Sequence, residues 1–151
     1  WCLLTPLFCG NIINEVVVMI LAKRLKYGDD LKKEIEKLCY ENNITSAAVI
    51  SSVGCVYKAT IRLADGATIK EYNDNYEILS VNGTVSKNGS HLHICFSDKN
   101  SDTFGGHLCY NTLVNTTCEL VIVSIDNYLF IREYDEKTGY DELIIYTKED
   151  F

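Results

Sequence analysis

The stretch HLHICFSDKNSDTFGGHL, His91 to Leu108, contains all three histidines of this 151-residue chain. Residues 98–102 (DKNSD) have short polar side chains that hydrogen-bond their own backbone and favour tight turns. The stretch therefore predicts a β-hairpin centred near Asn100, in which the numbers of opposed residues sum to 200. In this register His93 faces His107 across the two strands.

The hairpin gathers the three imidazoles on one face. His91 and His93 share a face because side chains alternate along a strand, and His107 joins them because directly opposed side chains lie together. Neutral imidazole is a good zinc ligand, and packed imidazoles without a metal or an anion lose solvation energy. We therefore predict a divalent metal site at His91, His93 and His107. Zinc is the first choice, although nickel, copper and iron also suit imidazole. The alternative is three half-buried polar residues, each with one hydrogen bond.

Two further features of this stretch bear on the site. Gly105 and Gly106 precede His107, and glycine there permits a β-bulge or a close backbone approach that could re-aim the imidazole. Cys109 falls opposite His91 in the same register. It is either a packing thiol or a fourth metal ligand.

One helix is expected early in the chain. Gly28 ends a first strand, and Asp29-Asp30 place negative charge at the start of a helix, where the helix dipole favours it. Asn42-Asn43 end the helix. The apolar stripe between these limits has helical spacing and consists of Leu31, Ile35, Leu38 and Cys39.

The rest of the chain reads as strands separated by turn signals. The expected strands are residues 16–25, 46–53, 55–63, 76–85, 91–97, 107–114, 118–125 and 128–134. This order predicts an α+β fold, a mostly antiparallel sheet of about seven strands with one principal early helix. We expect a single domain over residues 19–151, preceded by an extension over residues 1–18, because Met19 is the only methionine and stands just before the organised part.

Composition limits the classes of function. The chain is 47% hydrophobic and 23% charged, as in ordinary soluble proteins, and its formal net charge is −7. That charge argues against direct, non-specific DNA binding, which depends on lysine and arginine. Seven cysteines without a Cys-x-x-Cys pair favour a reducing, cytoplasmic compartment. The longest unbroken apolar run near the N-terminus, residues 16–22, is too short to span a bilayer.

Several motifs occur in an order that resembles the plant-and-prokaryote-conserved (PPC) domain, which is fused to AT-hooks in plant nuclear proteins. They are RLKYGDDL (24–31), VG (53–54), YEILSVNG (76–83), HLH (91–93), GGHL (105–108), RE (132–133) and TG (138–139). The resemblance covers roughly residues 19–143.

The resemblance implies a homotrimer. Three histidines of the family, with the same 2- and 14-residue spacings as His91, His93 and His107, form a metal-binding unit, so the resemblance assigns these three residues to it. Bacterial members carry a DNA-binding label that derives from the AT-hook, and this chain has no such element. The implied function is therefore a trimeric metal-binding regulatory or interaction module, whose DNA binding is weak or passes through protein partners. In plant members the stretch corresponding to residues 75–79 contacts partners and begins Gly-Arg, whereas here it begins Asn-Tyr.

The fold also resembles acetolactate decarboxylase, in which three histidines hold zinc. This gives an alternative of another class, a zinc-dependent lyase or hydrolase acting on a small oxo-acid. Glu77 and Glu119 are its candidate acid–base residues and Arg62 its candidate carboxylate clamp, although all three are also ordinary polar positions on half-exposed strands. A pocket beside the metal lined by a carboxylate and an arginine favours the enzyme. A closed or flat surface favours the module.

Overall fold

The structure is a computed structural model that describes residues 18–150. Its elements are β1 (Ile20–Lys26), α1 (Leu31–Glu41), β2 (Ser46–Arg62), β3 (Ile69–Tyr72), β4 (Tyr76–Ser86), β5 (Gly89–Ser97), β6 (Thr103–Leu108), β7 (Leu113–Ser124), β8 (Tyr128–Asp135), β9 (Tyr140–Thr147) and the short 3₁₀ helix η1 (Lys148–Asp150). The expected α+β class, with one principal early helix, is confirmed. The segment expected as an extension lies, apart from Val18, outside the described residues.

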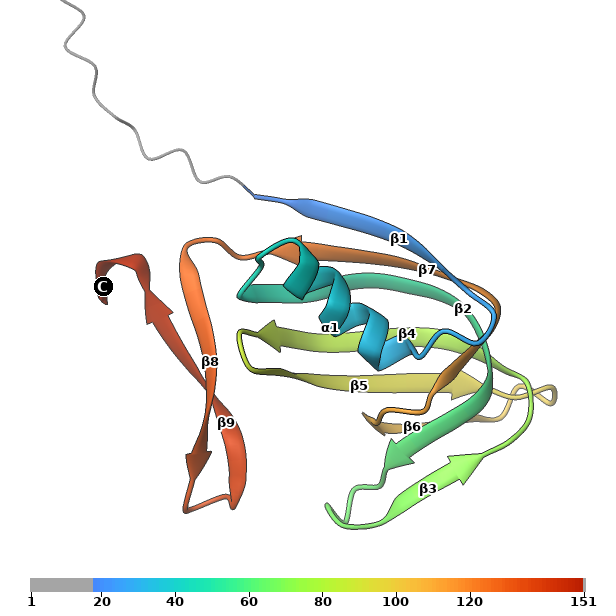
Figure 1. Ribbon diagram of the computed structural model, residues 1–151. Helices are drawn as coiled ribbons and strands as arrows, with labels where there is room; N and C mark the ends of the chain where they lie inside the picture. The colour runs from blue at the N-terminus through green and yellow to red at the C-terminus, as the bar shows by residue number, and fades with distance from the viewer. Residues whose placement is uncertain (1–17, 151) are drawn as a thin grey trace, which may run out of the picture.

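Seven strands form one antiparallel sheet in the order β1-β7-β2-β4-β5-β6, with β3 attached to β2. Helix α1 lies over one face of this sheet, and the hairpin of β8 and β9 stands at one end of it as a separate two-stranded sheet (Figure 1). No helix within residues 18–150 is long and apolar enough to cross a membrane.

Strand β2 organises the sheet because different parts of it pair with different neighbours. Its first part lies between β7 and β4, and its last part pairs with β3 and β6. The pairings β2–β4, β4–β5, β5–β6 and β6–β2 therefore close a circuit of four strands. In the β2–β6 pair, Arg62 is the partner of His107. The two strands expected at 46–53 and 55–63 are thus one continuous strand, whose register against β7 shifts at three irregular points, one of them beside Gly54.

The helix begins and packs as its sequence predicts. The Asp30 carboxylate accepts a hydrogen bond from the Lys33 N–H at 3.1 Å, so it caps the helix. Leu31, Ile35 and Cys39 are buried against the sheet, and Leu38 is partly buried beside them. The core therefore lies between α1 and the sheet.

The strand expected over residues 107–114 is wrong. Strand β6 ends at Leu108 and β7 begins at Leu113. The buried Thr112 hydroxyl accepts from the Thr60 N–H and donates to the Thr60 carbonyl oxygen, both at 3.1 Å, which takes the place of ladder hydrogen bonds. Asn111 has φ +70°, a turn conformation that interrupts an extended strand. Strands β3 and β9 were not expected at all.

Candidate metal centre and its cavity

The predicted hairpin register is confirmed. In the β5–β6 ladder Phe96 pairs with Phe104 and His93 pairs with His107. Along β5, Leu92 and Ile94 are buried, whereas the alternating His91 and His93 are exposed. The strand period thus directs both imidazoles away from the core, toward the side where His107 also lies.

The three imidazoles form a compact cluster. Their ring centroids are 5.0–5.6 Å apart, and Nε2 of His91 lies 3.2 Å from Nε2 of His93. One nitrogen from each of His91, His93 and His107 lies within 4.8 Å of the others. The structure therefore brings together all three residues that the sequence predicts as metal ligands.

Glycines allow the strands around the cluster to approach closely. A Cβ on Gly105 would collide with the Ile94 carbonyl oxygen, and one on Gly106 would lie 2.7 Å from the carbonyl oxygen of Arg62. The β5–β6 register runs without a shift through both glycines. Of the two expected roles for this glycine pair, the close approach is confirmed and the bulge is wrong.

Cys109 does not take the expected place opposite His91. The β5–β6 ladder ends at the pair of His93 and His107, and the Cys109 N–H donates to the Thr60 carbonyl oxygen at 3.1 Å. Its Sγ lies 3.7 Å from the backbone carbonyl oxygen of His107. Because Cys109 has turned to pair with β2, it lies outside the histidine cluster.

Burial and nearby positive charge lower the pKa of two of the three histidines, His107 and His91. Burial, with a further contribution from Arg62, lowers the pKa of His107 to about 4. Burial, followed by the charge of His93, also lowers the pKa of His91. The Nδ1 atom of His107 is buried and has no hydrogen-bond partner. At neutral pH, His91 and His107 therefore offer unprotonated nitrogens, the form that binds a metal.

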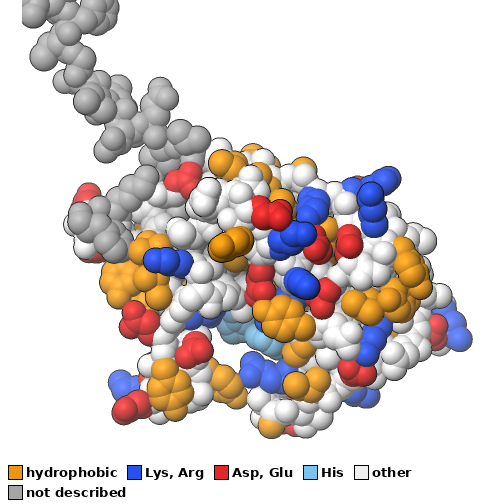
Figure 2. Space-filling model, viewed as in Figure 1, with side chains coloured by type: hydrophobic (Ala, Val, Ile, Leu, Met, Phe, Trp, Pro, Cys, Tyr) orange, Lys and Arg blue, Asp and Glu red, His pale blue; other side chains and the backbone are white. Residues whose placement is uncertain are grey.

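The cluster opens into a cavity of about 910 Å³. Helix α1, the turn between β2 and β3, and the β8–β9 hairpin all contribute to its walls. In Figure 2 the histidine surface lies recessed at the margin of a hollow, next to Lys and Arg side chains. The charged residues that line the cavity are Lys32, Glu36, Arg62, Asp65, Arg132, Asp141 and Glu142.

The candidate enzyme residues separate into two groups. Arg62 lines the cavity beside the histidines. Glu77 is exposed and pairs with Cys55 and Ser97 within the sheet, and the equally exposed Glu119 lies between β1 and β2. Neither glutamate lines the histidine cavity, so the structure does not bring these two candidate acid–base residues to the histidines.

Sequence reasoning missed Arg132 and Glu142. Both line the main cavity and also a smaller one of about 350 Å³, which shares His91 and His93 with it. Arg132 lies on β8 and Glu142 on β9, in the separate two-stranded sheet. No local pattern connects them to the histidines, because only tertiary packing brings this hairpin to the site.

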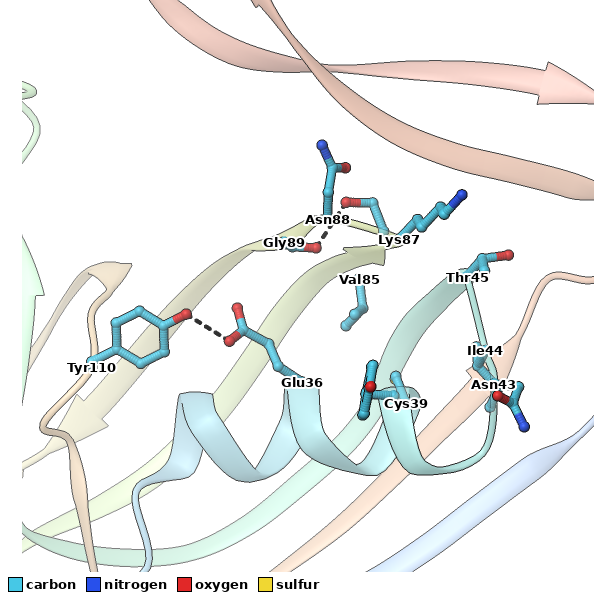
Figure 3. A pocket seen from close by; sticks show the side chains of 12 residues that line it. Glu36, Cys39, Asn43, Ile44, Thr45, Val85, Lys87, Asn88, Gly89 and Tyr110 are labelled. Atoms are coloured by element: carbon cyan, nitrogen blue, oxygen red, sulfur yellow. Dashed lines mark hydrogen bonds between the residues drawn. The ribbon is translucent and has the colours of Figure 1, made fainter.

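A neighbouring cavity of about 560 Å³ lies between α1 and the turn that joins β4 to β5 (Figure 3). Glu36 accepts hydrogen bonds there from the Tyr110 hydroxyl at 2.7 Å and the Ser90 hydroxyl at 2.6 Å. The bond to Glu36 is the main cause that raises the pKa of Tyr110 to about 12. Glu36 thus joins α1 to the wall of the histidine cavity.

Comparison with known proteins identifies the family. The family model of the Plants and Prokaryotes Conserved (PCC) domain matches residues 14–126. The chain belongs to this family. The bifunctional protein GlmU of a Synechococcus strain is 39% identical to this PCC domain over 122 residues, which are 81% of the chain and 19% of that protein. The chain thus spans about a fifth of the length of the curated relatives it matches.

Solved structures agree with the fold of the PCC domain. A hypothetical protein from Salmonella is 29% identical with a TM-score of 0.83, and the match covers 87% of this chain and 96% of that one. A metal-containing protein from Archaeoglobus fulgidus is 30% identical with a TM-score of 0.74, and the match covers 83% and 93% of the two chains.

Proposed function

We propose that this PCC domain is a trimeric metal-binding module that holds one divalent ion, zinc in the first place, on His91, His93 and His107. The observation that carries the proposal is the convergence of one nitrogen from each imidazole within 4.8 Å. In this proposal the module associates with DNA only through protein partners.

The donor set fits zinc. Two nitrogens that bind one tetrahedral zinc ion at about 2.0–2.1 Å are roughly 3.3 Å apart, and the Nε2 atoms of His91 and His93 are 3.2 Å apart. Three neutral ligands leave the full charge of the ion and an open coordination position, so bound zinc supplies a Lewis acid. The metal-containing relative from Archaeoglobus fulgidus supports a metal in this family.

Exposed apolar residues on the sheet support assembly. Val53 on β2 is 59% exposed and Leu79 on β4 is 52% exposed. The register that pairs Gly54 with Ile78 places Val53 beside Leu79. A second copy of the chain would remove this apolar patch from water. The cysteines that the structure describes are free thiols, which supports a reducing compartment, and we propose the cytoplasm.

One observation favours the alternative of a zinc-dependent enzyme acting on a small oxo-acid. An open cavity lies beside the histidines, and an arginine, Arg62, and a carboxylate, Glu142, line it. A closed or flat surface would have favoured a pure interaction module.

Calorimetric titration of metal-free protein with Zn²⁺ tests the metal site. We expect one zinc ion per chain for the wild type and loss of binding in His93→Ala, whereas Cys109→Ser should bind as the wild type does because Cys109 lies outside the cluster. Absence of zinc binding to the wild type, with no gain in melting temperature, would show that the histidines are a polar cluster.

A further inference from the structure

Two arginines in the wall of the histidine cavity form no ion pair with a carboxylate of the described residues. The ion pairs within residues 18–150 are all made by lysines. Arg62, at the end of β2, and Arg132, on β8, both line the cavity, and the Nε atom of each is buried without a hydrogen-bond partner. Removing a guanidinium from water without an anion is unfavourable.

Neutral groups hold Arg62 in place. Its guanidinium lies over the Tyr140 ring, 5.0 Å from the centroid, and Nη1 is 3.5 Å from the Gly66 carbonyl oxygen. The Tyr140 hydroxyl donates to the same carbonyl oxygen at 3.2 Å. This support fixes the side chain without neutralising it, so its positive charge stays available to a ligand.

Arg132 is held in the same manner from the other sheet. Its Nη2 donates to the Thr84 hydroxyl at 3.1 Å, and Nη1 lies 3.4 Å from the Asp141 backbone carbonyl oxygen. Burial lowers its pKa, although the nearby carboxylates of Glu142 and Asp141 oppose that effect. Within residues 18–150, neither Arg132 nor Arg62 is in ion-pair contact with a carboxylate.

Two of the carboxylates in the wall are already engaged elsewhere. Glu36 accepts from Ser90 and Tyr110, and Asp65 accepts from the Ala67 and Thr68 backbone N–H groups within its own loop. Arg62 lies beside the histidines, because it is the partner of His107 in the β2–β6 pair and lines the same cavity. The cavity thus has an unpaired cation directly beside the metal-ligating cluster.

We propose that the cavity binds a small carboxylate. One carboxylate group forms a charge-assisted, bidentate contact with Arg62, and the rest of the molecule extends toward the histidine cluster, in a cavity that Arg132 also lines. The proposal deepens the metal site and rests on it for the second contact of the ligand. A volume of about 910 Å³ accommodates a molecule of this size. Planar guanidinium groups match carboxylates in both geometry and charge.

Malonate, a three-carbon dicarboxylate, serves as the probe in calorimetric titrations of zinc-loaded and metal-free wild type. We expect binding to the zinc-loaded protein, weakened at least about tenfold by Arg62→Gln, because a charge-assisted bidentate contact is lost. Arg62→Lys should recover only part of the affinity. Arg24→Gln, which removes an exposed arginine on β1, is the matched control and should bind as the wild type does.

Zinc affinity of each variant is measured separately, so the two proposals fail in different ways. Arg62→Gln should bind zinc at least as tightly as the wild type because a repelling cation is gone. Equal malonate affinity in the wild type and Arg62→Gln would overturn the proposal and show that malonate binds the metal alone. Absence of malonate binding to a protein that holds zinc would overturn it as well. If zinc does not bind but malonate does, in an Arg62-dependent manner, the carboxylate site stands and the metal site falls.

Discussion

The charge state of His107 makes the stability of the metal-free protein depend on pH. Its pKa in the folded chain is about 4 because of burial, whereas an unfolded histidine titrates near 6.5. Between these values the unfolded chain binds a proton that the folded chain does not, so the free energy of unfolding falls as pH drops below about 6.5. The lowered pKa of His91 acts in the same direction.

Urea unfolding of chelator-treated protein at pH 7.5 and pH 5 measures this effect. We expect a lower midpoint at pH 5, and a smaller difference between the two pH values in His107→Gln, which cannot titrate there. An equal drop in both proteins would assign the pH dependence to other groups.

In the proposed metal site His93 and His107 serve one ion, so their substitutions should not be additive. His93→Ala and His107→Ala should each lower zinc content and melting temperature, because bound metal stabilises the folded state. The double substitution should cost little more than either single one, since the first already releases the ion. Inductively coupled plasma metal analysis and thermal melts with and without zinc provide the measurement. Additive losses of stability without any loss of metal would contradict the prediction that the two histidines bind one ion.

Helices and hairpins that are set by residues close together in the sequence could be predicted from it. The hairpin that carries the histidines follows from the two-residue strand period and from the turn chemistry of residues 98–102, and its register is confirmed. Helix α1 follows from the Asp30 cap and the spacing of Leu31, Ile35 and Cys39. These features depend on residues a few positions apart, so the sequence alone displays them.

Elements that depend on distant partners escaped prediction. The pairing of Ile61 with Leu108 and of Arg62 with His107 joins β2 to β6, and nothing near Arg62 in the sequence signals it. Strand β9, YDELIIYT, lacks a regular polar–apolar alternation and gains its partner only from β8. For this reason the histidine cluster could be predicted, whereas the presence of Arg132 and Glu142 beside it could not.

The close approach of β6 to its neighbours gives a test at this scale. Gly105→Ala would place a methyl group against the Ile94 carbonyl oxygen, so the strands must separate. We expect a loss of stability of about 1–3 kcal/mol, the usual range for overpacking, and weaker zinc binding because β6 carries His107. Thr103→Ala, at an exposed position of the same strand, is the control for chemical denaturation and zinc titration. Unchanged stability in Gly105→Ala would show that the strands accommodate a side chain there.

For the whole molecule we predict a closed trimer. Multi-angle light scattering at micromolar concentration should give about three times the chain mass of 17.1 kDa. Val53→Asp, in the exposed apolar patch, should shift the mass toward the monomer because a charge cannot be buried there without a partner. The exposed Lys26→Ala on β1 is the control. A wild-type monomer would contradict the prediction.

The net charge of −7 predicts weak DNA binding by the isolated chain. Few surplus cations are available to replace the counterions of the phosphates, so any binding should be weak and fall steeply with salt. A gel-shift titration with an AT-rich duplex at physiological salt should show no complex below micromolar protein. Tight, sequence-selective retention would establish direct recognition.

The closed circuit of β2, β4, β5 and β6 has a consequence for the order of folding. The three histidines are close along the chain and meet as soon as one hairpin forms, a step with a small loop-closure entropy. Arg62 and Arg132 reach the same cavity only after pairings between distant segments have formed, which are slower to assemble. If the two proposed sites exist, metal capture would thus precede the finished fold, whereas recognition of an anion would require it. In a refolding experiment, the delay between zinc binding and malonate binding would measure the time that the circuit of strands takes to close.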